Sequence, residues 1–204
     1  MSTITILGAG NMAAAIGGRA ARAGHTVEVM SRDADRARAL AERLGHGAVA
    51  GTFGERPAGD LVVLAVLHAG AVDAVGQFGE ALSGKVVVDI TNPFNADGSG
   101  LVTGPGDSVA DRVAAVLPGD AHVVKAFNTV YGGAISSGAP MAAFFAGDDE
   151  VKPLVAGFLE SLGMRPLDAG GLEMAHALEW AGLLLVGVSR NGAGFDVALG
   201  VDAV

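Results

Sequence analysis

The chain has 204 residues, half of them hydrophobic, with 32 glycines and a formal net charge of −9. This length and apolarity predict a globular protein with a buried core rather than a disordered chain. Because the sequence contains no cysteine, disulfides, thiolate catalysis and cysteine-ligated zinc are excluded. The acidic balance argues against nucleic acid as a partner.

Strand-like and helix-like segments alternate along the chain. The expected strands are residues 3–7, 25–30, 61–66, 85–90, 122–127, 141–146 and 164–167. The expected helices are residues 11–22, 33–44, 69–82, 108–117, 149–162 and 172–190. Asp148 or Asp149 is the expected N-cap of the helix 149–162. Residues 92–107 are expected to form a long loop. The alternation predicts an α/β protein of the Rossmann type, with a doubly wound, mainly parallel sheet, a single domain over 1–204 and a C-terminal capping helix.

A glycine-rich turn follows the first expected strand. The sequence GAGNMA, which begins at Gly8, matches the pattern G-x-G-x-x-G/A between a strand and a helix. In this pattern Gly8 permits the tight turn, Gly10 lets the backbone approach a pyrophosphate, and Ala13 allows the helix to pack closely on the strand. The helix N-terminus then offers free N–H groups to the phosphates. The predicted pyrophosphate-binding residues are Gly8, Ala9, Gly10, Asn11 and Met12.

Positive charge is concentrated beyond this turn, with six of the 13 basic residues between positions 19 and 43. An NAD-binding protein usually has a carboxylate at the tip of the second strand, about 20 residues after the glycines. Here Glu28 lies inside the strand and Asp33 suits the cap of the next helix, which leaves Ser31 and Arg32 at the tip. A hydroxyl and a guanidinium suit a 2′-phosphate, and Arg36 follows one turn into the helix. We therefore expect NADP(H), with ordinary solvated arginines as the alternative.

Lys125 and Asn128 end the apolar sequence VVKAFN and are the candidate catalytic residues. A lysine among apolar neighbours is costly to bury unless it is paired. Lys125 could bind a phosphate, the nicotinamide amide or a flavin carbonyl, or it could form a structural ion pair with Asp89 or another acid. Asn128 could form a hydrogen bond to a ring edge, or it could cap the turn before residues 131–133. Both interpretations stay open for each residue.

Several segments together resemble the coenzyme F420-dependent NADP oxidoreductase family. They are GAGNMA, SRDADRAR, VVVDITNPF, VVKAFNTV and GDDEVKPLVAGFLESLGMRPLDAGGL. The same segments resemble the cytoplasmic oxidoreductase domain of six-transmembrane metalloreductases, to which VVKAFN is closer. The resemblance implies hydride transfer between NADP(H) and an acceptor, either F420 or a flavin. Such a step needs the protein mainly to stack two rings and exclude water.

The resemblance also implies roles for further residues. The tip formed by Ala65, Val66, Leu67 and His68 would line the adenosine and phosphate side of the cofactor, and Asn92 and Pro93 would position the nicotinamide. Residues 171–204, the last helix and tail, would complete the acceptor pocket and contribute to a homodimer. We expect a cytoplasmic protein with no membrane partner, since the N-terminus lacks signal-peptide features and the apolar run 180–188 is too short to cross a bilayer.

Two other functions remain open. The start GAGNMAAAI also resembles pyrroline-5-carboxylate reductases, whose imine site is completed by a helical domain, whereas one long helix is expected here after the last strand. A non-catalytic NADPH sensor would equally lack a general acid. No metal site is expected, because the histidines show no ligand spacing. His176 lies three residues from Glu173 and from Glu179 on one helix, but an exposed helix face is the simpler interpretation.

Overall fold

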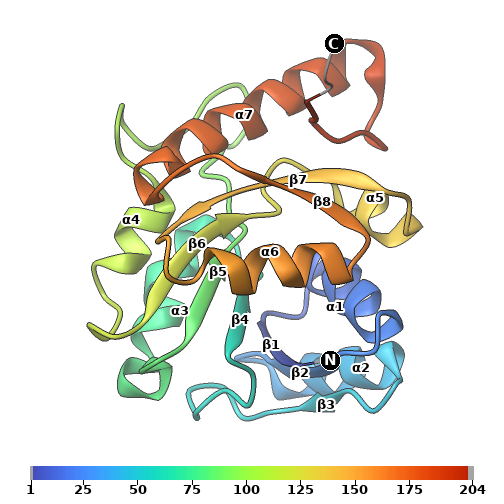
Figure 1. Cartoon of the computed structure of the whole chain (residues 1–204), viewed down its shortest axis with the longest axis vertical. Helices are drawn as coiled ribbons and strands as arrows, with labels where there is room; N and C mark the ends of the chain where they lie inside the picture. The colour runs from blue at the N-terminus through green and yellow to red at the C-terminus, as the bar shows by residue number, and fades with distance from the viewer. Residues whose placement is uncertain (1, 202–204) are drawn as a thin grey trace.

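A computed structural model describes residues 2–201. One eight-stranded sheet runs through the molecule in the order β3-β2-β1-β4-β5-β6-β7-β8 (Figure 1). The strands are β1 (Thr3–Leu7), β2 (Thr26–Met30), β3 (Val49–Ala50), β4 (Leu61–Leu64), β5 (Val86–Asp89), β6 (His122–Ala126), β7 (Met141–Gly147) and β8 (Met164–Asp168). All neighbours pair in parallel except β6 and β7. The mainly parallel Rossmann-type sheet is confirmed. Its strand order reverses between β1 and β4, which is where such sheets bind ligands.

Seven α-helices of the described chain connect and cover these strands. They are α1 (Asn11–Arg22), α2 (Ala34–Leu44), α3 (Ala71–Gly76), α4 (Val109–Ala114), α5 (Gly132–Ser137), α6 (Lys152–Ser161) and α7 (Ala175–Val188). Shorter helical turns are η1 (His68–Gly70), η2 (Gly79–Leu82), η3 (Leu172–Met174) and η4 (Ser189–Ala193). Figure 1 shows α7, in red, crossing the end of the molecule that holds β7 and β8.

Successive residues of a strand pack into two separate hydrophobic cores, one on each face of the sheet. Ile4 and Ile6 of β1 belong to a core shared with α1, α2 and α6, whereas Leu7 belongs to a core shared with α3 and α4. Both faces of the central strands are therefore buried. This explains why the sequence is continuously apolar over β4 and over the first three residues of β5.

Several elements differ from the sequence-based expectation. The segment 69–82 is not one helix, because α3 ends at Gly76 and the separate turn η2 begins at Gly79, whose φ is +46°. The turn expected before residues 131–133 is present at Asn128 and Thr129, and it is followed directly by α5, with Tyr131 as the N-cap of that helix. Helix α6 begins at Lys152 after Val151, so neither Asp148 nor Asp149 is its cap. Asp149 instead pairs with the Lys152 ammonium at 2.8 Å.

The last helix is longer than its apolar run suggests. The turn η3, the helix α7 and the turn η4 follow one another over Leu172–Ala193, with a kink at Asn191 and Gly192. By length and composition alone this segment could cross a membrane, and a third of its most apolar part is buried inside the fold. The apolar run 180–188 is the central part of this longer helical segment. Residue Glu179, near its middle, is fully buried against the sheet. Residues 202–204 of the expected C-terminal tail lie outside the described residues.

Arg19 of α1 is buried and joins distant parts of the chain. Its guanidinium donates to the carbonyl oxygens of Leu162 at 2.5 Å, Ala139 at 2.9 Å and Ile135 at 3.2 Å. These carbonyls belong to the ends of α5 and α6 and the turns beyond them, where a helix leaves its last C=O groups without intrahelical partners. A single guanidinium therefore provides hydrogen-bond donors for the carbonyl groups at the C-terminal ends of both α5 and α6.

Candidate functional site

The glycine turn is shaped for close backbone approach. Gly8 has φ +124°, and a Cβ there would lie 2.2 Å from the carbonyl oxygen of Ala65. Around Gly10, by contrast, a Cβ would meet no described atom within 4 Å, so this side of the turn is open. Gly10 is the N-cap of α1 and offers no side chain to the first N–H groups of that helix. These features fit a pyrophosphate bound at the helix N-terminus.

A hollow of about 270 Å³, which we call the arginine pocket, opens beside this turn. It is lined by Gly8, Ala9, Gly10, Ser31, Arg32, Arg36, Phe53, Ala65, Val66, Leu67 and Ala74. The predicted glycine turn, the predicted 2′-phosphate residues and most of the predicted β4 tip thus come together. His68, from the same tip, is not among the lining residues. Burial, followed by the charge of Lys125, lowers the pKa of His68.

The arginines at this pocket differ in their partners. Among the ion pairs of residues 2–201, none involves Arg32 or Arg36, whereas Arg38 pairs with Asp35. Asp33 caps α2 as expected, accepting a hydrogen bond from the backbone N of Arg36 at 3.1 Å. Two guanidinium groups are therefore available to an anion in the arginine pocket.

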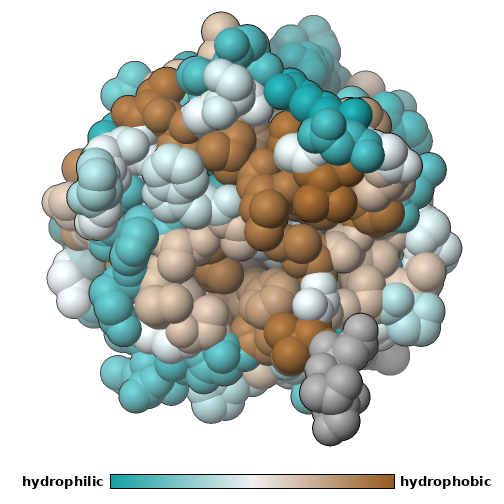
Figure 2. Space-filling view, turned by 90° about the horizontal axis from the view of Figure 1, so that it is seen from above, coloured by the Kyte–Doolittle hydropathy of each residue, from teal (hydrophilic) through white to brown (hydrophobic). Residues whose placement is uncertain are grey.

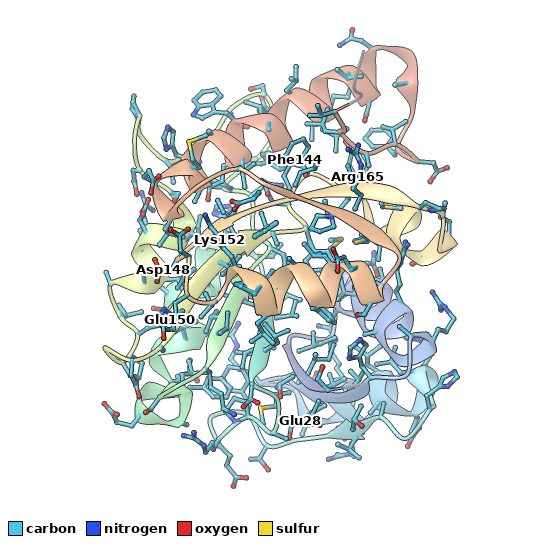
Figure 3. The ribbon with its side chains drawn as sticks, in the orientation of Figure 1. Glu28, Phe144, Asp148, Glu150, Lys152 and Arg165 are labelled. Atoms are coloured by element: carbon cyan, nitrogen blue, oxygen red, sulfur yellow. The ribbon has the colours of Figure 1, made fainter. Side chains whose placement is uncertain are left out.

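Glu28 has a structural role that explains why no carboxylate faces the pocket. Its Oε2 accepts hydrogen bonds from the Thr5 hydroxyl at 2.7 Å and the Ala58 backbone N at 2.9 Å. Glu28 lies at the end of the molecule that holds β1–β3 (Figure 3). Its contacts hold the loop between β3 and β4, which carries Phe53 to the pocket wall. Sequence reasoning missed Phe53, because an isolated aromatic residue in a loop has no motif.

A second hollow of about 170 Å³, the asparagine pocket, lies farther along the carboxyl ends of the strands. Its lining residues are Met12, Ile90, Asn92, Phe94, Phe127, Asn128, Val130, Tyr131, Gly132, Gly182, Leu185 and Val186. Asn92 donates to the carbonyl oxygen of Asn128 at 2.7 Å, and the Asn128 amide donates to Asn92 Oδ1 at 3.0 Å. The expected partner Pro93 is buried and does not line this pocket; its carbonyl accepts from Val102 N at 2.8 Å.

Asn128, which lines this pocket, has an acceptor atom without a partner in the described chain. Its amide nitrogen also donates to the carbonyl of Leu178 on α7 at 2.7 Å, which fixes the orientation of the side chain. Its Oδ1 is buried and has no partner among the described residues. The preceding residue, Phe127, has φ +59°, a strained conformation for an aromatic residue, and residues strained in this way cluster at active sites and ligand clamps. A ligand that donates an N–H would satisfy the Asn128 oxygen.

Lys125 is not placed to touch a ligand. Its side chain is fully buried, and its ammonium donates to Asp89 at 2.8 Å, Glu179 at 2.8 Å and the carbonyl of Thr91 at 2.5 Å. An ammonium has three donors, and all three are used. Its candidacy as a substrate-contacting residue is therefore corrected, and the ion-pair interpretation with Asp89 is confirmed.

Glu179 is the partner that the sequence could not reveal. Its Oε1 accepts from Lys125 and from the backbone N of Val109 at 2.9 Å, while its Oε2 has no partner among the described residues. Burial raises the pKa of Glu179, and the charge of Lys125 opposes that effect. Glu179 bonds to Lys125 and Val109, whereas the Nδ1 of His176 bonds to the carbonyl of Glu173 at 2.6 Å. Within residues 2–201 no three potential metal ligands cluster.

Comparisons with known proteins agree with this geometry. Residues 3–93 match the family model described as NADP oxidoreductase, coenzyme F420-dependent. An F420-dependent NADP reductase of Methanocaldococcus jannaschii is 31% identical over 140 residues, which cover 64% of this chain and 62% of that protein. The chain therefore spans less than two thirds of this curated relative.

Solved structures extend the likeness to the whole chain. A crystal structure described as a putative F420-dependent NADP reductase from Arthrobacter superposes over 100% of both chains, with a TM-score of 0.87 and 25% identity. A reductive aminase from Aspergillus terreus, solved with NADPH, matches 95% of this chain and 63% of that one, with a TM-score of 0.65 and 23% identity, and this likeness shows the fold alone. The glycine turn and the arginine pocket lie at the part of the chain that matches the family model, and the chain is similar in sequence and in fold to F420-dependent NADP reductases.

Proposed function

We propose that the protein is an NADPH-dependent oxidoreductase that transfers hydride between NADP(H) and a deazaflavin, F420, with a free flavin as the alternative acceptor. The observation that carries the proposal is the arginine pocket. It joins a pyrophosphate-binding glycine turn to Ser31, Arg32 and Arg36, with no carboxylate among its lining residues. A 2′-phosphate suits this set, because guanidinium groups bind phosphate oxygens in a bidentate manner.

The residues present fit NADP(H) at both ends. The open space at Gly10 and the N-terminus of α1 would hold the pyrophosphate, while Asn92 and Asn128 would hold the nicotinamide carboxamide. The buried, unpaired Oδ1 of Asn128 is the acceptor that the carboxamide N–H₂ needs. NADPH when bound supplies the hydride. The chain itself binds, orients and shields the reacting ring, and none of these roles requires a general acid.

The acceptor would enter beside the asparagine pocket. That pocket shares Met12, Tyr131 and Gly132 with a larger hollow of about 680 Å³. The rings of Tyr131 and Phe195 lie at its rim with centroids 5.4 Å apart, so the C-terminal tail supplies part of the wall. A planar acceptor ring would pack against these aromatic faces. In this proposal residues 171–201 complete the acceptor pocket of a single domain.

A stopped-flow experiment tests the function. The protein is mixed with NADPH and, separately, with F420, FMN, FAD and riboflavin, and the absorbance of each oxidised acceptor is followed. Fast reduction of F420 supports the proposal, and preference for a flavin favours the alternative acceptor. If NADPH binds but no acceptor is reduced, the oxidoreductase proposal fails and the NADPH-sensor interpretation or an imine substrate takes its place.

We also propose that the protein acts as a homodimer through α7. Trp180, Leu184 and Val188 are 48%, 60% and 45% exposed and lie four residues apart, so they share one helix face. Figure 2, which looks onto the end of the molecule where α7 lies, shows a broad apolar area there. Two copies packed antiparallel about Leu184 would place Trp180 against Val188, which makes the face self-complementary. A light-scattering mass equal to one chain would refute this.

A further inference from the structure

The Lys125 cluster, which consists of Asp89, Lys125 and Glu179, lies directly beneath the turn that carries Asn92. All three side chains are fully buried. They come from β5, β6 and α7, and Asp89 and Lys125 are direct neighbours in the register of the parallel sheet. The cluster therefore joins the sheet to the helix that walls the asparagine pocket.

Stability alone does not account for this cluster. It holds two carboxylates for one ammonium, and one oxygen of Glu179 is without a partner among the described residues. Desolvating such charges is expensive, and replacing a buried ion pair or triad by neutral residues of similar volume is often neutral or stabilising. Its specific contacts point to a different role.

Those contacts hold the two peptide groups on either side of the Thr91 Cα. Asp89 Oδ1 accepts from the backbone N of Thr91 at 2.9 Å, and Lys125 donates to the carbonyl oxygen of Thr91 at 2.5 Å. The next residue is Asn92, so the contacts of Asp89 and Lys125 with Thr91 set the backbone direction at Asn92 and hence the position of its side chain in the asparagine pocket.

The same cluster holds α7 at a fixed distance from Asn92. Glu179 pairs with Lys125, and the neighbouring carbonyl of Leu178 accepts from Asn128. One turn further on, a Cβ at Gly182 would lie 2.6 Å from Asn92 Oδ1, so the helix passes very close to the asparagine side chain. The sheet, the turn that carries Asn92 and the helix α7 are therefore packed so closely that the Asn92 side chain has little room to move.

We propose that Lys125 is a positioning residue, which acts with Asp89 and Glu179 to hold Asn92 and Asn128 against α7 in the arrangement that receives the nicotinamide ring. The inference rests on the proposed function. Lys125 acts through the Thr91–Asn92 peptide and does not touch the ligand. Because the phosphates and adenosine bind in the separate arginine pocket, the cluster governs the placement of the ring rather than the affinity for the whole cofactor.

The test uses a charge-free cluster. The triple variant Asp89→Asn, Lys125→Met, Glu179→Gln keeps the side-chain volumes and the acceptors for Thr91 N and Val109 N. It removes the hydrogen bond from Lys125 to the Thr91 carbonyl oxygen. The matched control is Asp149→Asn, Lys152→Met, Asp168→Asn, which neutralises a second lysine with two carboxylates that lies outside both pockets. Lys152 is labelled in Figure 3 beside α6.

Three quantities are measured on both variants: the Kd for NADPH, the enhancement of nicotinamide fluorescence on binding, and the single-turnover rate of hydride transfer. We expect the cluster variant to keep its melting temperature and NADPH affinity, to lose most of the fluorescence enhancement, and to transfer hydride at least about tenfold more slowly, since small misplacements of a reacting ring are costly. The control should match the wild type.

Two results would overturn the inference. One is a cluster variant with unchanged fluorescence and rate. The other is a variant whose NADPH affinity, rate and melting temperature all fall together, which would make the cluster merely structural. If the wild type reduces no acceptor, the proposed function fails. The fluorescence of bound NADPH still tests the positioning role in that case.

Discussion

Arg32→Ala should reduce the preference of the protein for NADPH over NADH by about tenfold. Arg32 lines the arginine pocket and has no ion-pair partner within residues 2–201, so its guanidinium is free for the 2′-phosphate. A hydrogen bond to a charged group contributes about 1.5–3 kcal/mol, and the exposure of Arg32 favours the lower end of that range. A loss of about 1.5 kcal/mol raises the Kd for NADPH roughly tenfold.

Fluorescence titration with NADPH and with NADH gives both dissociation constants. The expected result is weaker NADPH binding with NADH binding unchanged, because NADH lacks the phosphate. Arg38→Ala is the matched control: it removes the same charge from the same segment, but Arg38 pairs with Asp35. Equal effects on the two nucleotides, or equal effects of the two substitutions, would refute the assignment of the 2′-phosphate site.

Three further predictions concern the scaffold. Gly8→Ala should weaken binding of both nucleotides and lower the melting temperature, because the new Cβ would lie 2.2 Å from the Ala65 carbonyl oxygen; calorimetry and titration check this. Arg19→Met should lower the free energy of unfolding by about 3 kcal/mol in urea titrations, since it leaves several buried carbonyls without donors, and a loss below about 1 kcal/mol would contradict the role given to Arg19. Burial lowers the pKa of His25 from its usual 6.5, so the unfolded chain binds the proton more readily and the free energy of unfolding should fall as the pH drops below 6.5. His25→Phe should reduce this pH dependence, measured by urea unfolding between about pH 5 and pH 8.

Local sequence patterns were enough to predict the elements and the candidate site residues in the N-terminal part of the chain, which contains the glycine turn and the arginine pocket. The glycine turn, the cap at Asp33 and the tip at Ser31 and Arg32 are all read from neighbouring residues, because each depends on the geometry of one βαβ unit. The strand β3 was missed, since two exposed residues carry no periodicity.

The second half depends on contacts that no local pattern encodes. The partner of Lys125 is Glu179, 54 residues later, and only the docking of α7 brings them together. The antiparallel direction of β7 likewise follows from the path of the chain rather than from its composition. The glycine-rich sequence that begins α5 has the composition of a turn, and packing against α1 makes it a helix.

The buried guanidinium of Arg19 has a consequence for how the chain folds. Its carbonyl partners at Ile135 and Leu162 lie 116 and 143 residues later in the sequence. During synthesis α1 can form and pack on β1, but the arginine has to stay hydrated until more than a hundred further residues have emerged. Contacts of such long range slow folding and make it cooperative over the whole chain. A nascent N-terminal half would therefore expose the seam between α1 and α5, and chaperone binding to ribosome-bound chains should end only after residue 162 has left the exit tunnel.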